Sequence, residues 1–294
     1  MLQSGEYTFT ANGLKLWYKV SGNGPVCVMP TPGWGSSSDI YFLSLQKLDE
    51  FFTMVYLDTR GSGRSERPPT PQDYTYEQFA SDLDALRQHL GQEQILVLGH
   101  SQGGVHAMQY ALRYPEGCRG LILADSFPAF DAHLSEDMQK NAMKHQQEPW
   151  FETAFEALNN EEEIQNEAEY KEYIEAILPF YLVDQEVPKR YADAFETGTF
   201  SLEAMKGQEA VQLTVNLLPE LHKIDIPTLI VVGSDDFICS PLQSERIHFG
   251  IKNSKLIVIQ NSGHFPWMEQ PEQFYARVKA GLDVLNLIQP EISD

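Results

Sequence analysis

Short apolar runs recur along the chain, and none of them alternates between apolar and polar residues. Such uninterrupted runs are typical of strands in a parallel sheet whose two faces are both covered by helices. Amphipathic stretches that predict helices lie among these runs. The predicted strands are 26–30, 54–58, 95–99, 120–125, 228–233 and 255–260, and the predicted helices are 76–91, 103–115, 241–250 and 271–287. This alternation predicts an α/β fold with a mostly parallel central sheet and helices on both faces.

Two segments depart from the alternation. Residues 7–20 alternate polar and apolar side chains around Asn12-Gly13, which predicts a β-hairpin. Residues 128–222 contain no strand-like run but several amphipathic helical stretches. We therefore expect residues 1–127 and 223–294 to form one core, and residues 128–222 to form a helical cap inserted in it.

The charge of the chain argues against nucleic acid as a partner. Asp and Glu total 42 against 21 Lys and Arg, which gives a net charge of −21, whereas phosphate binding requires a basic surface. The interval from Pro128 to His222 holds 20 acidic and 6 basic residues, a net charge of −14. The predicted cap therefore carries two thirds of the net charge.

The sequence offers no sign of export or of a membrane partner. No stretch approaches the ~18–20 uninterrupted apolar residues of a membrane span, and the N-terminal segment lacks the pattern of a signal peptide. The three cysteines, Cys27, Cys118 and Cys239, are odd in number and far apart, which favours free thiols in a reducing compartment. We expect a cytoplasmic protein, and the oligomeric state is left open.

Ser101 lies at the junction between a predicted buried strand and a predicted helix, in the segment LVLGHSQGGVHAM. An abrupt strand-to-helix turn strains the backbone of its central residue, and Gly99 and Gly103 leave room for that turn. The turn would place the Ser101 hydroxyl near the positive end of the helix, where the N–H of Gln102 can donate to an oxyanion. The sequence therefore predicts Ser101 as a nucleophile.

A serine nucleophile requires a base and an acid that orients the base. Two later strands end in loops that supply them: SDDFICS after residue 233 and NSGHFPWMEQP after residue 260. Ligands of α/β sheets bind at this edge, beyond the carboxyl ends of the strands. The sequence therefore predicts His264 as the base and Asp236 as the acid, with Asp235 as the alternative acid.

The motifs GHSQG, GSDD, SGH and DTRGSGRS (58–65) together resemble those of the α/β-hydrolase family over nearly the whole chain. The last loop is similar to that of proline iminopeptidases, haloalkane dehalogenases and carboxylesterases. The family spacing after Gly233 favours Asp236 over Asp235. The resemblance also implies an oxyanion donor in the loop after residue 30, where Pro32 lacks an N–H, so Trp34 is the candidate and Gly33 the alternative. The Trp34 indole either lines the pocket or packs.

The resemblance implies a serine hydrolase that cleaves an ester or amide of a small substrate through a covalent acyl-enzyme, without cofactor or metal. A dehalogenase would require Asp in place of Ser101. A non-catalytic receptor or binding scaffold of the same fold is another alternative, which the presence of all three triad residues disfavours. The expected partners are thus small esters, amides or short peptides.

A proline iminopeptidase-like aminopeptidase is the nearer alternative, because acidic lid residues of that subfamily hold the free amine of a peptide. Glu172 and Glu175 are the candidates here, since they stand three residues apart on one predicted helical face. Gln102 departs from the tryptophan usual in that subfamily, and TPGWG departs from its oxyanion loop. The acidic cap is otherwise interpreted as a solvated surface.

Overall fold

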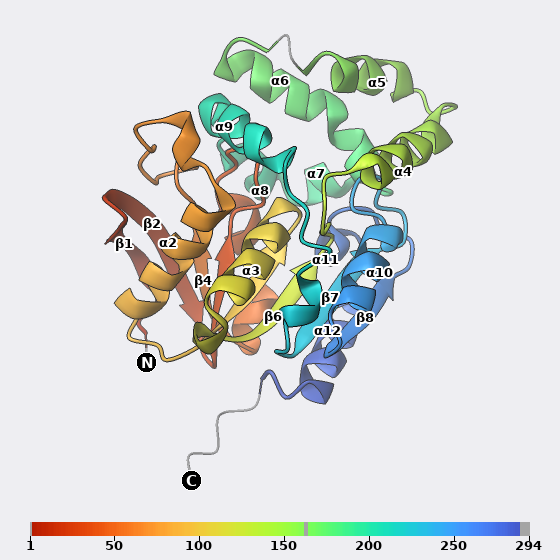
Figure 1. Ribbon diagram of the computed structural model, residues 1–294. Helices are drawn as coiled ribbons and strands as arrows, with labels where there is room; N and C mark the ends of the chain where they lie inside the picture. The colour runs from red at the N-terminus through yellow and green to blue at the C-terminus, as the bar shows by residue number, and fades with distance from the viewer. Residues whose placement is uncertain (1, 162–163, 289–294) are drawn as a thin grey trace.

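The computed structural model of the protein describes residues 2–161 and 164–288. Within these residues, eight strands form one sheet in the order β1-β2-β4-β3-β5-β6-β7-β8 (Figure 1). The predicted hairpin is present as β1 (Gly5–Ala11) and β2 (Leu14–Gly22), and β2 continues antiparallel onto β4 (Thr53–Leu57). The remaining strands run parallel: β3 (Val26–Pro30), β5 (Ile95–His100), β6 (Cys118–Ala124), β7 (Thr228–Gly233) and β8 (Ser254–Ile259). The predicted α/β fold is confirmed.

Helices cover both faces of the sheet. Neighbouring residues of a strand point to opposite faces, so each strand contributes side chains to both helix-covered cores. The predicted helices are present as α2 (Tyr76–His89), α3 (Gln102–Arg113), α10 (Pro241–Gly250) and α12 (Pro271–Val284). In β5, Ile95 and Val97 belong to a core with residues of α2, α3 and α10. Leu96 and Leu98 belong to a second core, with residues of α12. Burial on both faces explains why the strands read as continuous apolar runs.

Helices fill the interval between β6 and β7, as the sequence predicts. They are α4 (Ala132–Ala142), α5 (Phe151–Asn159), α6 (Glu167–Ile177), α7 (Val187–Arg190), α8 (Ala192–Thr197) and α9 (Leu202–Gln212). Figure 1 shows α4, α5 and α6 above the sheet. Helix α9 and the short helices α1 (Asp39–Phe42) and α11 (Pro266–Glu269) were not predicted. The expected core and cap ranges also include residues 1, 162–163 and 289–294, which lie outside the described residues, and the division at 128 and 222 stays a prediction.

The DTRGSGRS loop holds the segment that leads into α1. Asp58 is fully buried, and one carboxylate oxygen accepts hydrogen bonds from the Ser38 backbone N–H at 2.8 Å and the Ser38 hydroxyl at 2.6 Å. Arg64 donates from its guanidinium to Asp58 at 2.5 Å and to Asp39 at 2.7 Å. Gly63 has a φ of 53°, and a Cβ there would lie 2.2 Å from the Asp58 carboxylate. The loop therefore has a structural role: it fixes residues 38 and 39 at the start of α1.

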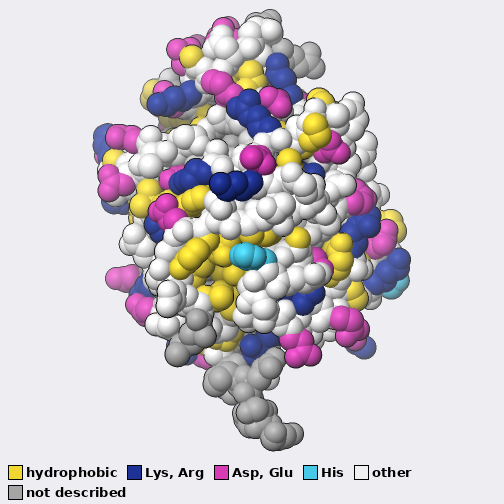
Figure 2. All heavy atoms as spheres, turned by 90° about the vertical axis from the view of Figure 1, so that its left-hand side faces the viewer, with side chains coloured by type: hydrophobic (Ala, Val, Ile, Leu, Met, Phe, Trp, Pro, Cys, Tyr) yellow, Lys and Arg dark blue, Asp and Glu magenta, His cyan; other side chains and the backbone are white. Residues whose placement is uncertain are grey.

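The free thiols that the number and spacing of the cysteines predict are present. Cys27, Cys118 and Cys239 are free and buried. None of the helices described here combines the length and the apolarity that crossing a bilayer requires. The face seen in Figure 2 shows acidic and basic side chains interspersed around apolar ones, without a field of one sign.

Candidate active site

Ser101 occupies the strained strand-to-helix turn that the sequence predicts. Its backbone has φ 54° and ψ −129°, between the end of β5 and the start of α3. A Cβ at Gly99 would lie 2.3 Å from the carbonyl oxygen of Gly103, so only glycine permits this close approach. The hydroxyl of Ser126 donates to the carbonyl oxygen of Ser101 at 2.8 Å. Packing and this hydrogen bond hold the turn in its strained conformation.

His264 and Asp236 form a buried hydrogen-bonded pair. Asp236 follows β7 and His264 follows β8, and the distance from His264 Nδ1 to Asp236 Oδ2 is 2.7 Å. Their exposed fractions are 3% and 2%. Because a carboxylate can only accept, Nδ1 carries a proton, and in the neutral imidazole Nε2 keeps its lone pair. Asp235, by contrast, is exposed.

The other oxygen of Asp236 is held by the backbone. Asp236 Oδ1 accepts hydrogen bonds from the N–H groups of Ile238 at 3.0 Å and Cys239 at 3.1 Å. These bonds fix the carboxylate, and the carboxylate in turn fixes the plane of the imidazole. The geometry therefore favours Asp236 over Asp235 as the partner of His264.

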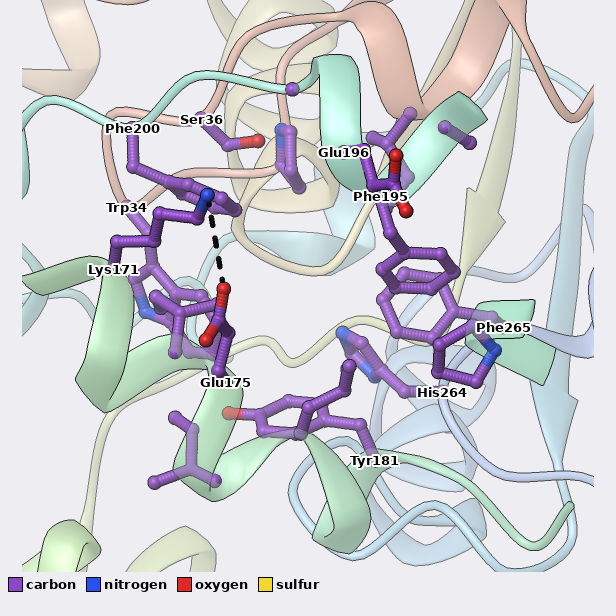
Figure 3. A pocket seen from close by; sticks show the side chains of 18 of the residues that line it. Trp34, Ser36, Lys171, Glu175, Tyr181, Phe195, Glu196, Phe200, His264 and Phe265 are labelled. Carbon is purple, nitrogen blue, oxygen red and sulfur yellow. Dashed lines mark ion pairs between the residues drawn. The ribbon is translucent and has the colours of Figure 1, made fainter. Parts of the chain in front are cut away.

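Ser101 and His264 both line a cavity of about 560 Å³ between the sheet edge and the helices of residues 128–222. Its wall is largely apolar, and Figure 3 shows His264 flanked by Tyr181 and Phe265. The aromatic lining residues are Trp34, Tyr181, Phe195, Phe200 and Phe265. Such a cavity suits a small organic ligand with an apolar body.

The loop after β3 lies against the start of α3, where the two expected oxyanion donors meet. A Cβ at Gly33, whose φ is 106°, would lie 2.2 Å from the Gln102 side-chain oxygen. Trp34 also has a positive φ, 55°. Among the described residues, the backbone N–H groups of Trp34 and Gln102 have no hydrogen-bond acceptor. Both are available to an oxyanion. The Trp34 side chain lines the cavity and contacts Tyr181 edge to face, with ring centroids 5.3 Å apart.

The two acidic candidates of the cap occupy different positions. Glu175 lines the cavity and pairs with Lys171 at 3.8 Å, with both side chains 65% exposed (Figure 3). Glu172 is exposed and does not line the cavity, because the side of α6 that faces the cavity carries Lys171, Ile174 and Glu175. Glu196 of α8 also lines the cavity. The sequence did not reveal Glu196, since its orientation depends on how α8 docks.

The pKa shifts of the histidine and the cysteine nearest the candidate triad favour their neutral forms. Burial, and the proximity of the His264 imidazole, lower the pKa of His100 well below its usual value. Its Nε2–H donates to the carbonyl oxygen of His264 at 2.9 Å, and its Nδ1 is 2.9 Å from the Tyr41 hydroxyl. Burial and the carboxylates of Asp236 and Asp125 raise the pKa of the Cys239 thiol. His100 therefore supports the His264 backbone, and Cys239 is a buried thiol.

Three side chains of this region could present metal-ligating atoms. Asp236, Cys239 and His264 each offer one such atom, all within 4.8 Å of one another. The Nδ1 atom of His264 is hydrogen-bonded to Asp236, and Asp236 Oδ1 is held by two backbone N–H groups. These hydrogen bonds are those of a histidine oriented by a carboxylate.

Asp125 is a buried carboxyl group beside Asp236 that the sequence did not single out as a site residue. It follows β6, is fully buried, and accepts a hydrogen bond from the N–H of Gly233 at 2.8 Å. Burial and the negative charge of Asp236 raise its pKa well above the usual value. A sequence signal existed, since Asp125 ends a predicted strand at the edge that carries Ser101. The structure thus places Asp125, whose raised pKa favours the neutral form, next to Asp236.

We expect stability to depend on the proton of Asp125. Because its pKa is raised in the folded protein, the folded state keeps a proton that the unfolded chain releases above about pH 4. The stabilisation is complete below the unfolded pKa and is lost as pH rises through the folded pKa. Asp125→Asn has the same shape and no proton to lose. Urea unfolding at about pH 5 and pH 8 should show the wild type losing stability relative to this variant. An equal difference at both values would contradict a neutral Asp125.

Comparison with known proteins agrees with the fold. The model of the alpha/beta hydrolase fold family matches residues 28–271. A proline iminopeptidase of Saccharolobus solfataricus is 28% identical over 92% of this chain and 90% of its own length. Another, from Clostridium botulinum, is 30% identical over 88% of this chain and 92% of its own.

Among solved structures, an alpha/beta fold family hydrolase from Bacillus anthracis aligns with a TM-score of 0.79. It is 19% identical, and the alignment covers 95% of this chain and 99% of that one. This likeness concerns the fold. The matches make the protein a hydrolase, which sets aside the alternative of a non-catalytic receptor. The chain belongs to the alpha/beta hydrolase fold family.

Proposed function

We propose that the protein hydrolyses esters or amides with Ser101 as nucleophile, His264 as general base and Asp236 as the residue that orients His264. The observation that carries this proposal is the buried Asp236–His264 pair, whose imidazole lines the same cavity as Ser101 at its strained turn. A nucleophile, a base and an acid held in this way are the requirements of acyl transfer.

In the first half-reaction His264 Nε2 takes the Ser101 proton while Oγ bonds to the substrate carbonyl carbon. The carbonyl oxygen becomes an oxyanion, which the N–H groups of Trp34 and Gln102 stabilise. His264 then gives its proton to the leaving alcohol or amine as the bond to carbon breaks. In the second half-reaction a water replaces the leaving group, and the same proton transfers release the acid and restore Ser101.

The cavity favours a substrate with an apolar group beside its ester or amide. Its wall consists mainly of aromatic and aliphatic side chains, and its charged members stand out in solvent, as the 65% exposure of Lys171 and Glu175 shows. An exposed ion pair contributes about 1 kcal/mol or less to binding. Apolar contact is therefore the main source of affinity that we propose.

A second candidate function is an aminopeptidase that holds a free N-terminal amine. Two observations favour it: relatives named proline iminopeptidase match nearly the whole chain, and two carboxylates, Glu175 and Glu196, line the cavity. Figure 3 shows them on different sides of the cavity. Lys171 partly neutralises Glu175. Among the side chains described, Glu196 forms no ion pair and is the better ligand for an ammonium group.

A comparison of kcat/KM for an aminoacyl amide and its N-acetylated form separates the two functions. An ester or amide hydrolase that relies on apolar contact should use the acetylated substrate equally well or better. An aminopeptidase should prefer the free amine by tenfold or more, about 1.4 kcal/mol. The preference should then disappear in Glu196→Gln and persist in the control Glu172→Gln, which changes an exposed carboxylate outside the cavity. Failure to cleave these amides and a panel of p-nitrophenyl esters would contradict both functions.

A further inference from the structure

Glu269 is a buried carboxylate that joins two segments of the cavity wall. It stands at the end of α11 with an exposed fraction of 7%. Its Oε1 accepts a hydrogen bond from the N–H of Gly263 at 2.7 Å. Its Oε2 accepts from the N–H of Val183 at 2.8 Å and of Asp184 at 3.1 Å. One carboxylate thus bridges the residue before His264 and the chain that leaves the turn Leu178–Tyr181.

The same two segments also meet through their backbones. The N–H of His264 donates to the carbonyl oxygen of Tyr181 at 2.8 Å. A Cβ at Gly263 would lie 2.4 Å from that oxygen, so glycine is required for this approach. The Tyr181 ring lies edge to face with the His264 ring, 5.2 Å between centroids, and lines the cavity. The substrate-facing wall and the imidazole are therefore parts of one hydrogen-bonded unit.

Backbone N–H groups compensate the negative charge of Glu269. Among the residues described, no lysine or arginine pairs with it, and its hydrogen bonds come from N–H groups and from the Ser262 hydroxyl at 3.5 Å. Hydrogen bonds from N–H groups to a buried carboxylate are stronger than those between neutral groups. Burial nevertheless raises the pKa of Glu269 above its usual value. A carboxylate kept at such a site is costly unless its partners stay in place.

We infer that Glu269 is a positioning residue: it fixes residues 181–184 against the loop of His264, so that substrate contact with the cap and the position of the base are set together. The inference rests on the proposed hydrolysis, because it assigns His264 the role of base. It assigns Glu269 no contact with the substrate.

A glutamine at this position should be unable to accept all the hydrogen bonds that Glu269 accepts. Both carboxylate oxygens accept from backbone N–H groups, so a glutamine amide must turn its NH₂ toward one of these donors in either orientation. In one orientation the NH₂ faces the N–H of Gly263, and in the other it faces the N–H groups of Val183 and Asp184. The variant therefore breaks one side of the bridge while it keeps the size of the side chain.

The test compares Glu269→Gln with Glu272→Gln, which changes an exposed carboxylate three residues along the chain. With Glu269→Gln, kcat for p-nitrophenyl acetate should fall by about 10- to 100-fold, because small displacements of a base have effects of this size. KM should rise for an ester whose long acyl chain reaches Tyr181, and much less for the acetate. The control should match the wild type. Unchanged kcat in a folded Glu269→Gln, or a rise of KM alone, overturns the inference.

Hydrogen exchange provides a measurement that is independent of activity. In the wild type the amides of Gly263, Val183 and Asp184 should open together, with equal protection, and in Glu269→Gln protection should drop on the side of the bridge that the amide NH₂ faces. Unequal protection in the wild type overturns the inference even if the variant fails to fold. A wild type that cleaves no ester overturns the proposed function, whereas an active wild type with an equally active Glu269→Gln overturns the role of Glu269 only.

Discussion

Ser101→Ala should lower kcat for ester hydrolysis by about 10⁴- to 10⁶-fold, the largest effect that we expect from a single substitution. Without the hydroxyl no acyl-enzyme forms, and the residual rate comes from the oxyanion donors and from binding alone. The fold should survive, because alanine fits the turn between β5 and α3 and the hydrogen bond from Ser126 is made to a backbone carbonyl. Steady-state kinetics with p-nitrophenyl esters measures the loss of kcat, and circular dichroism of the same variant checks the fold.

A fluorophosphonate identifies the nucleophile directly. It should label the wild type on the peptide that contains Ser101 and leave Ser101→Ala unlabelled. Ser126→Ala is the control, since Ser126 follows β6 and its hydroxyl donates only to the backbone carbonyl oxygen of Ser101. That variant should still be labelled. Label on any other residue, or near-normal turnover by Ser101→Ala, would show that the proposed nucleophile is wrong.

Asp236→Asn should lower kcat by about 10³- to 10⁴-fold, the second largest expected effect. The carboxylate accepts from His264 Nδ1 at 2.7 Å, and an amide whose NH₂ faces Nδ1 would favour the other tautomer, with the proton on Nε2. His264 could then no longer take the proton of Ser101. The same assay applied to purified variants measures the loss.

Asp235→Asn is the internal control for this substitution. Asp235 is exposed and adjacent in sequence, so its loss should change kcat by no more than about twofold. A larger loss from Asp235→Asn than from Asp236→Asn would exchange the two roles. If both substitutions lowered kcat only slightly, neither aspartate would orient His264, and the proposed mechanism would lack its acid.

The parts of the candidate site that the sequence could predict are those that follow from local patterns. The strand-to-helix turn at Ser101 was predictable because Gly99 and Gly103 flank the junction between an apolar run and an amphipathic one. The proximity of Asp236 and His264 was predictable because each follows a buried strand, and parallel strands end at one edge. The strand spans were predictable because burial on both faces leaves a continuous apolar run. The helix spans were predictable because their apolar residues recur with the helical period.

The parts that the sequence did not reveal depend on how distant segments pack. Asp125 differs from a surface aspartate only because β7 and its loop cover it. Glu269 reads as an ordinary acid in PWMEQP, and its three N–H donors come from two separate segments. Glu196 faces the cavity and Glu172 does not, and that difference follows from the docking of the cap helices.

The adjacency of β6 and β7 has a consequence for folding kinetics. These strands pair from Leu121 with Thr228 to Ala124 with Val231, although the helices α4 to α9 separate them in sequence. Closing so long a loop is entropically costly and slow compared with forming local helices. The pocket wall and the Asp125–Gly233 contact exist only after that closure. During refolding from urea, helical signal should therefore return first and catalysis last, which makes recovered activity a report on the completion of the fold.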